Sequence, residues 1–157
     1  MKIVNIPKLP WEDYSSPGGK YVASWKQPSE KLGDRRNAWP KGGHPFNLEL
    51  NRVPPGKAPC PFHFHTTQWE MFVIVSGTGT VRAGRKRQKI KAGDAFIHPP
   101  GEAHQIINTG KQDLVFYIIA DNPPVDIFHY PDSGKWGLRP YGKYFRMAQA
   151  SYYDGEE

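Results

Sequence analysis

Short runs of apolar residues, several of them alternating with polar ones, recur along this chain between segments that carry glycine and proline. Runs of about four to eight residues rich in Val, Ile, Phe and Tyr are typical of β-strands that bury one face. The pattern predicts strands over residues 46–52, 70–75, 88–92, 95–98, 105–108 and 113–120. No stretch keeps a sustained helical period, so we expect an all-β fold.

Glycine and proline mark the turns between these strands. Gly77 follows the strand at 70–75, where a residue without Cβ permits a sharp bend or a bulge. Gly93-Asp94 separates the strands at 88–92 and 95–98, and Pro99-Pro100-Gly101 predicts a further turn before His104. A hairpin centred on Gly84 joins two more extended segments. Many short strands with tight turns favour a rolled sheet.

Three histidines and one glutamate stand out against this background. His63 and His65 are two positions apart, so on an extended strand both imidazoles point to the same side. Glu70 begins the next predicted strand, and His104 lies 34 positions beyond it, so that only a closed or nearly closed sheet could bring all four together. Imidazole nitrogens and a carboxylate oxygen suit one divalent ion of Mn, Fe, Co, Ni, Cu or Zn and leave coordination positions open.

Two motifs in this region resemble those of the cupin superfamily. The second cupin motif is met from Gly93 through Pro99, Gly101 and His104 to Asn108 without a gap. The first is met by the metal-ligand candidates His63, His65 and Glu70 and by Gly77, with its leading glycine, Gly56, one residue further upstream than usual. The segment Asp126–Lys135, with its Tyr-Pro-Asp-Ser-Gly-Lys sequence, resembles the tail of largely uncharacterised bacterial single-domain cupins.

The resemblance implies a cupin-like double-stranded β-helix, or jelly-roll barrel, with His63, His65, Glu70 and His104 as metal ligands. We expect the barrel at residues 41–125, an N-terminal arm at 1–40 that packs on the barrel or on a partner, and a C-terminal extension at 126–157. Cupin chemistry includes dioxygenase, isomerase, epimerase and decarboxylase reactions, and the resemblance does not choose among them.

Alternation along the strands also predicts an apolar pocket around the ion. Its expected lining is Leu48, Leu50, Phe72, Ile74 and Ile106, with Gln68 and Gln105 as polar candidates that could equally face outward. Such a pocket fits a small organic ligand, including an anionic one, whose oxygen atoms bind the metal.

Three functional classes stay open at this point. The chain could be a metal-dependent enzyme for a small oxygen-bearing substrate, a binding or sensing module for a sugar or small acid, or a barrel with a purely structural metal. A barrel that keeps these residues without metal is a further alternative, although an unneutralised cluster of imidazoles and carboxylate in an apolar barrel is costly.

Composition and charge refine this picture in one place. The chain has 157 residues, enough for one domain, and 21 of them are Phe, Tyr or Trp, so that rings supply much of the core. The net charge of +6 equals the charge of residues 82–91, which carry six cations and no acid: Arg82, Arg85, Lys86, Arg87, Lys89 and Lys91. A solvated edge protected by charge explains the run, and steering of an anionic substrate or contact with a polyanion are the alternatives. Without interleaved aromatic residues, the run argues against nucleic-acid binding.

Aromatic residues are frequent in both terminal segments, at Trp11, Tyr14, Tyr21, Trp25 and Trp39 and again at Trp136, Tyr141, Tyr144 and Phe145. Disordered tails are poorer in aromatic residues, so we expect both segments to cover a surface, either in a homodimer or by wrapping around their own barrel. The single Cys60 excludes an internal disulfide, and no membrane span or apolar leader is recognisable, which favours a cytoplasmic protein.

The remaining candidate residues receive simpler interpretations. Cys60 is expected to be an idle or buried thiol. His98 is expected at the surface end of its strand, and His44 and His129 are expected at the surface or rim.

Overall fold

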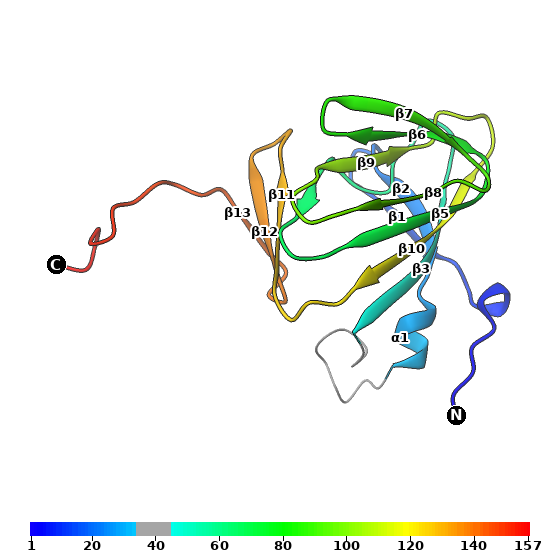
Figure 1. The fold of residues 1–157 in the computed structure, drawn as a ribbon, viewed down its shortest axis with the longest axis horizontal. Helices are drawn as coiled ribbons and strands as arrows, with labels where there is room; N and C mark the ends of the chain where they lie inside the picture. Colours follow the sequence, from blue (N-terminus) through cyan, green and yellow to red (C-terminus); the bar gives the residue numbers. More distant parts are fainter. Residues whose placement is uncertain (34–44) are drawn as a thin grey trace.

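The computed structural model describes residues 1–33 and 45–157, and within these the strands form a jelly-roll of antiparallel sheets. The large sheet has the spatial order β1 (Glu12–Ser15), β2 (Val22–Lys26), β3 (Phe46–Val53), β10 (Leu114–Asp121), β5 (Glu70–Ser76) and β8 (Ala95–His98). Facing it is a smaller sheet of β7 (Lys86–Lys91), β6 (Thr78–Ala83) and β9 (His104–Ile107) (Figure 1). The predicted all-β jelly roll is confirmed.

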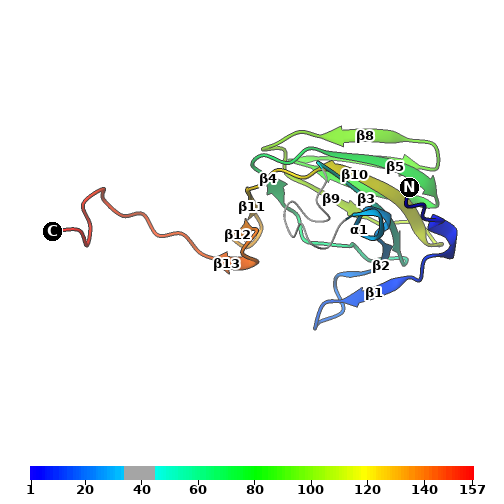
Figure 2. The same cartoon turned by 90° about the horizontal axis from the view of Figure 1, so that it is seen from below.

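A third sheet lies at one end of the barrel. It consists of β13 (Lys143–Phe145), β12 (Lys135–Arg139), β11 (Asp126–Tyr130) and the short β4 (Phe64–His65). Because β4 also carries a candidate ligand, this sheet ties the segment after residue 125 to the candidate site. In both views the chain beyond β13 runs away from the barrel (Figures 1 and 2).

Side chains from the two main sheets meet in one apolar core. Val53 of β3, Phe72 and Ile74 of β5, and Leu114 and Phe116 of β10 are buried against residues of the small sheet. This packing brings β5 and β9 to the same end of the barrel, where Glu70 and His104 begin their strands.

The segment before residue 33 contributes strands and a short helix to the outside of the barrel. β2 pairs with β3 and β1 pairs with β2, so these residues extend the large sheet. The helix α1 (Pro28–Leu32) and the 3-10 turn η1 (Ile6–Lys8) were not expected, because elements this short show no sequence period. Trp39 and His44 lie outside the described residues. The described residues include no helix that is long and apolar enough to cross a membrane.

Candidate metal centre

Two strand ends place the first pair of histidines opposite each other. His63 precedes β4 and forms an antiparallel bridge with His104, the first residue of β9. Their backbones exchange two hydrogen bonds, with N to O distances of 3.1 and 2.8 Å. Residues paired in this way project side chains to the same face, and the two ring centroids are 4.9 Å apart. A direct backbone bridge thus explains how residues 41 positions apart in the sequence converge.

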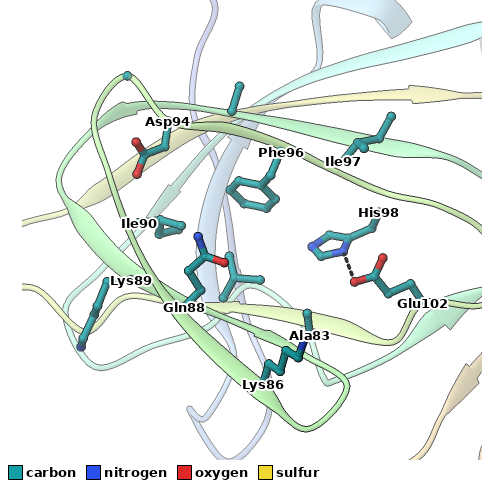
Figure 3. A pocket seen from close by; sticks show the side chains of 13 residues that line it. Ala83, Lys86, Gln88, Lys89, Ile90, Asp94, Phe96, Ile97, His98 and Glu102 are labelled. Atoms are coloured by element: carbon teal, nitrogen blue, oxygen red, sulfur yellow. Dashed lines mark ion pairs between the residues drawn. The ribbon is translucent and has the colours of Figure 1, made fainter.

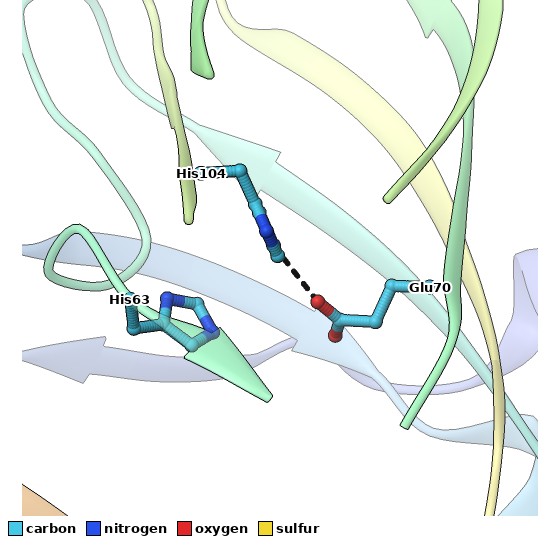
Figure 4. Close-up of side chains that lie close together, drawn as sticks. All are labelled: His63, Glu70 and His104. Carbon is cyan, nitrogen blue, oxygen red and sulfur yellow. Dashed lines mark hydrogen bonds and ion pairs between the residues drawn. The ribbon is translucent and has the colours of Figure 1, made fainter. Parts of the chain in front are cut away.

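The four expected ligand residues are brought together. Ligand atoms of His63, Glu70 and His104 all lie within 4.8 Å of one another (Figure 4). His65 Nε2 is 3.2 Å from His63 Nε2 and 3.7 Å from Glu70 Oε2, and His104 Nε2 is 2.9 Å from the same Glu70 oxygen. The Nε2 atoms of His65 and His104 therefore approach one Glu70 oxygen, and His63 Nε2 lies beside His65 Nε2, although His65 is outside the group whose ligand atoms all lie within 4.8 Å of one another.

The second nitrogen of each ring fixes which way the imidazole presents its lone pair. His63 Nδ1 lies 2.9 Å from the carbonyl oxygen of Pro61, and His104 Nδ1 lies 3.0 Å from that of Glu102. A carbonyl oxygen only accepts, so both Nδ1 atoms carry hydrogen and donate it. The Nε2 atoms then present lone pairs to the cluster, where Glu70 also offers only acceptors. Acceptors facing one another at these distances require a cation or a shared proton between them.

Asp126 gives His65 the same orientation. His65 Nδ1 is 2.5 Å from Asp126 Oδ2, and the Asp126 side chain is fully buried. Thr67 donates to Asp126 Oδ1 from its backbone nitrogen at 3.1 Å and from its hydroxyl at 3.0 Å. Burial would raise the pKa of Asp126, but the hydrogen bond with His65 and the Thr67 donors lower it, so the group stays a carboxylate. A carboxylate behind an imidazole is a common way to orient a metal-binding histidine.

The pKa shifts place a shared proton between His104 Nε2 and Glu70. Burial lowers the pKa of His63 to about 4, so this ring is neutral near pH 7. Burial alone would raise the pKa of Glu70, but the hydrogen bond from His104 and the charges of the nearby imidazoles bring it down to about 2. Burial also opposes the charged form of His104, yet Glu70 raises its pKa above the usual value. Near pH 7 the site is therefore an anionic carboxylate among imidazoles, which is suited to a divalent cation.

Three further candidate residues, Cys60, His98 and His129, fall outside this ligand set. Cys60 Sγ is 3.8 Å from His63 Nδ1, the nitrogen already engaged with Pro61, and burial raises the thiol pKa to about 12. His98 corrects an expectation, because it is buried rather than at the surface. Its ring stacks on His104 with centroids 4.1 Å apart, since β8 pairs with β5 so that His98 lies opposite Glu70. His129 is half-buried against Trp136.

A cavity of about 180 Å³ opens onto the cluster. Among the predicted pocket residues Phe72, Gln105 and Ile106 line it, together with His63, Glu70 and His104. Ile74 instead belongs to the apolar core. Gln68 does not line the cavity. Its side-chain nitrogen donates a hydrogen bond to the Asp121 carbonyl oxygen, and its side-chain oxygen accepts one from Arg139.

The other wall of the cavity corrects the expected position of Leu48 and Leu50. Glu49 and Asn51 line the cavity, so alternation places Leu48 and Leu50 on the opposite face of β3. Glu49 accepts hydrogen bonds from Asn47 at 3.1 Å and from Asn51 at 3.5 Å. These polar residues, and Trp25, which also lines the cavity, were not predicted from the sequence. The polar alternation at Asn47, Glu49 and Asn51 was the available signal.

Comparison with known proteins gives one matching family and several relatives. Residues 50–120 match the family model described as Cupin domain. The chain is 28% identical over 137 residues to Auxin-binding protein 1 of Arabidopsis thaliana, covering 82% of this chain and 63% of that protein. It is 37% identical over 68 residues to the Oxalate-binding protein of Thermotoga maritima, covering 43% of this chain and 55% of that protein. The chain thus spans less than two thirds of the length of these two relatives.

A solved structure supports the same fold across nearly the whole chain. The sugar phosphate isomerase from a cupin superfamily of Silicibacter pomeroyi superposes with a TM-score of 0.75, covering 98% of this chain and 99% of that one at 18% sequence identity. The superposition supports the fold. A sequence identity of 18% carries no information about activity.

Proposed function

We propose that this chain, which has the cupin double-stranded β-helix and a matching cupin domain over residues 50–120, binds one divalent transition-metal ion through His63, His65, Glu70 and His104. The observation that carries the proposal is that the Nε2 atoms of the three imidazoles gather at the Glu70 carboxylate, while acceptors hold the opposite ring nitrogens of His63, His65 and His104. The metal identity, among Mn, Fe, Ni, Co, Cu and Zn, is left to experiment.

The bound ion would serve a small oxygen-bearing organic ligand in the adjoining cavity. When present, such an ion supplies Lewis-acid polarisation or oxygen activation, which fits dioxygenase, isomerase or decarboxylase chemistry. A cavity of about 180 Å³ has the volume of about six water molecules, so the ligand is small. The cavity favours an enzyme or a binding module over a purely structural metal, because protein ligands fill all coordination positions of a structural site and no ligand has to reach the ion.

The charges around the cavity favour a neutral, hydroxyl-bearing ligand over a small anion. Two carboxylates, Glu49 and Glu70, line the cavity, and no lysine or arginine is among the described residues that line it. An anion would therefore find attraction only at the metal, with Glu49 opposing it. Hydroxyl groups would instead donate to Glu49 and exchange hydrogen bonds with Asn51, and Trp25 would cover an apolar ligand face. Oxalate, suggested by the name of the Thermotoga relative, is the competing ligand.

Replacing Glu49 with glutamine should separate these ligand classes. In metal-loaded protein, Glu49→Gln is expected to strengthen oxalate binding on the order of tenfold, because it removes a like charge and keeps the shape of the side chain. Isothermal titration with oxalate and with a neutral aldose, on the wild type and on the variant, would measure this. Asp113→Asn removes a carboxylate outside the cavity and should change neither affinity. Tight oxalate binding by the wild type that Glu49→Gln leaves unchanged would contradict the assignment.

Metal analysis tests whether the chain binds one transition-metal ion, on which the rest of the proposal depends. Protein purified without a metal-affinity tag or chelator should contain close to one transition-metal ion per chain by elemental analysis. Substitution with cobalt should then give an absorption spectrum that changes when a small ligand is added, as expected for an ion with an exchangeable position. Protein that neither retains nor takes up a stoichiometric ion would overturn the proposal, and a loaded but unresponsive cobalt site would indicate a structural metal.

Asp126 should influence the metal through His65 alone. Asp126→Asn is expected to lower metal affinity about 10- to 100-fold, because the amide no longer polarises and orients the imidazole as a carboxylate does. Competition with a chromophoric chelator would measure the affinity, and Asp132→Asn, an exposed carboxylate near the same sheet, is the matched control. An affinity loss of the same size in both variants would point to general destabilisation.

We further propose that the protein is a cytoplasmic homodimer of the single-domain cupin type whose tail it resembles, with an N-terminal arm at 1–40, a barrel at 41–125 and a C-terminal extension at 126–157. A lone cysteine is compatible with a reducing compartment, and the large exposed aromatic residues near the C-terminus support association.

A further inference from the structure

The basic hairpin, β6 and β7 with the turn at Gly84-Arg85, has more positive charge than its own surroundings neutralise. Arg82 donates two hydrogen bonds to Asp132, and Lys91 pairs with Asp94 at 3.3 Å. Arg85, Lys86 and Arg87 have no carboxylate partner among residues 1–33 and 45–157. β7 is also an edge strand on which only Ile90 is buried. The hairpin thus offers both uncompensated charge and free strand edge.

A cleft with both apolar and polar walls lies directly beside these cations. Its volume is about 590 Å³, and it is bounded by β7 on one side and β8 on the other (Figure 3). Ile90 and Phe96 supply apolar surface, Lys86 and Lys89 extend from β7 at the cleft, and Asp94 and Glu102 also line it (Figure 3). A partner that combines aromatic side chains with negative charge would match both features.

The C-terminal arm, residues 147–157, has that combination. Every residue of the arm is exposed, with Met147 at 56%, Tyr152 at 88% and Tyr153 at 64%. Asp154, Glu156 and Glu157 give it three negative charges and no positive one. Backbone hydrogen bonds from Asp154 to Ser151 and from Glu156 to Tyr153 form a turn that presents the tyrosines next to the acids. The arm leaves its own barrel in both views (Figures 1 and 2).

We propose that the C-terminal arm of one copy docks on the basic hairpin and cleft of a second copy, and that the two copies exchange arms around a two-fold axis. The tyrosines would occupy the cleft between β7 and β8, and the three acids would meet Arg85, Lys86 and Arg87. Eleven residues span at most about 38 Å when fully extended, and residues 147–150 before the turn already carry the tyrosines away from their own barrel (Figure 1). In a two-fold dimer each contact occurs twice, so weak single contacts reinforce each other.

A second copy fits these observations better than a small anion or a polyanion does. An inorganic anion would leave the apolar surface of Ile90 and Phe96 uncovered, and a polyanion would leave the exposed tyrosines of the arm uncovered. The interface deepens the homodimer proposed above. None of the four proposed ligand residues lies in the arm or on β6 and β7, so charge reversals there leave every ligand in place and metal content can be measured separately.

Charge reversal on each side of the contact provides the test. The arm variant carries Asp154→Lys, Glu156→Lys and Glu157→Lys, and the hairpin variant carries Arg85→Glu, Lys86→Glu and Arg87→Glu. Sedimentation equilibrium should show a dimeric wild type and a dissociation constant raised at least about tenfold in either variant alone. An equimolar mixture of the two variants should restore dimers, because in the mixed pair each arm again meets a hairpin of opposite charge.

Charge reversals away from the hairpin serve as controls for this interface. Lys2→Glu, Lys8→Glu and Lys111→Glu change the net charge equally at exposed positions elsewhere and should leave the dimer intact. The proposal would be overturned by a monomeric wild type, by variants that dimerise normally, or by a mixture that does not recover dimers. Variants that dimerise normally would assign the dimer contact to another surface, such as the exposed side chains of Met71, Val75 and Ile97. Metal content, measured on the same samples, should not change, so failure here is distinguishable from failure of the metal proposal.

Discussion

Replacing His104 with alanine is expected to lower the affinity for a divalent transition metal about 100-fold or more and to leave the purified protein nearly free of metal. The Nε2 atom of His104 lies 2.9 Å from Glu70, and its backbone bridge to His63 holds two of the four ligand residues together. Loss of a group that orients a ligand already costs about 10- to 100-fold, so loss of the ligand itself should cost at least as much. Elemental analysis and chelator competition would measure the effect.

The other histidines make this prediction specific. His63→Ala and His65→Ala should reduce metal occupancy to a similar extent, because each removes one inward-facing Nε2. His129→Ala should retain wild-type metal content, since that ring packs against Trp136 and Phe64. His98→Ala should lower affinity only a few-fold through the lost stack on His104. Equal metal content in all five variants would refute the ligand assignment.

The convergence of the candidate ligands followed from the sequence because it depends on local geometry and on a closed topology. Two-residue spacing placed His63 and His65 on one side, and a rolled sheet was needed to return His104 to them. The structure adds the backbone bridge between His63 and His104, which strand periodicity alone does not specify. Asp126 was missed because it lies 61 residues after His65, and only the pairing of β11 with β4 brings it close.

The cavity wall was misjudged for a different physical reason. On most strands the apolar face is the inner one, and Leu48 and Leu50 were assigned inward on that basis. In β3, however, Leu48 and Leu50 are half-buried on the other face, and α1 lies along the strand edge, where Ser29 accepts a hydrogen bond from the backbone of Leu48. Both faces of the strand are therefore partly shielded, and the polar set at Asn47, Glu49 and Asn51 faces a polar site. Alternation gives the two faces of a strand but not which of them lines a cavity.

His98 shows the same limit at a strand end. Its position directly before Pro99 suggested a surface residue, yet the pairing of β8 with β5 sets it opposite Glu70 and turns its ring toward His104. Strand boundaries were easier to predict, and residues 95–98 form β8 as expected, because glycine and proline on either side define the turns.

Gly77→Ala is expected to lower the free energy of unfolding by about 4 kcal/mol, since two penalties add. Gly77 has φ of +83°, a left-handed conformation that costs an alanine about 1–2 kcal/mol. In addition, a Cβ built there would lie 2.4 Å from the backbone oxygen of Asp113 and 2.9 Å from Cα of Leu114. Because these neighbours are backbone atoms at the start of β10, they cannot move aside without disturbing the pairing of β10 with β5.

Gly93 provides the matched control for this prediction. Its φ of +89° is nearly the same, but a Cβ there would meet no atom within 4 Å. Gly93→Ala should therefore cost only the conformational penalty of about 1–2 kcal/mol. Urea unfolding of both variants and the wild type, all stripped of metal, would give the two losses on one scale. A larger loss at Gly77 would show that this glycine is required for the close approach of two chain segments as well as for its turn, whereas equal losses would contradict that role.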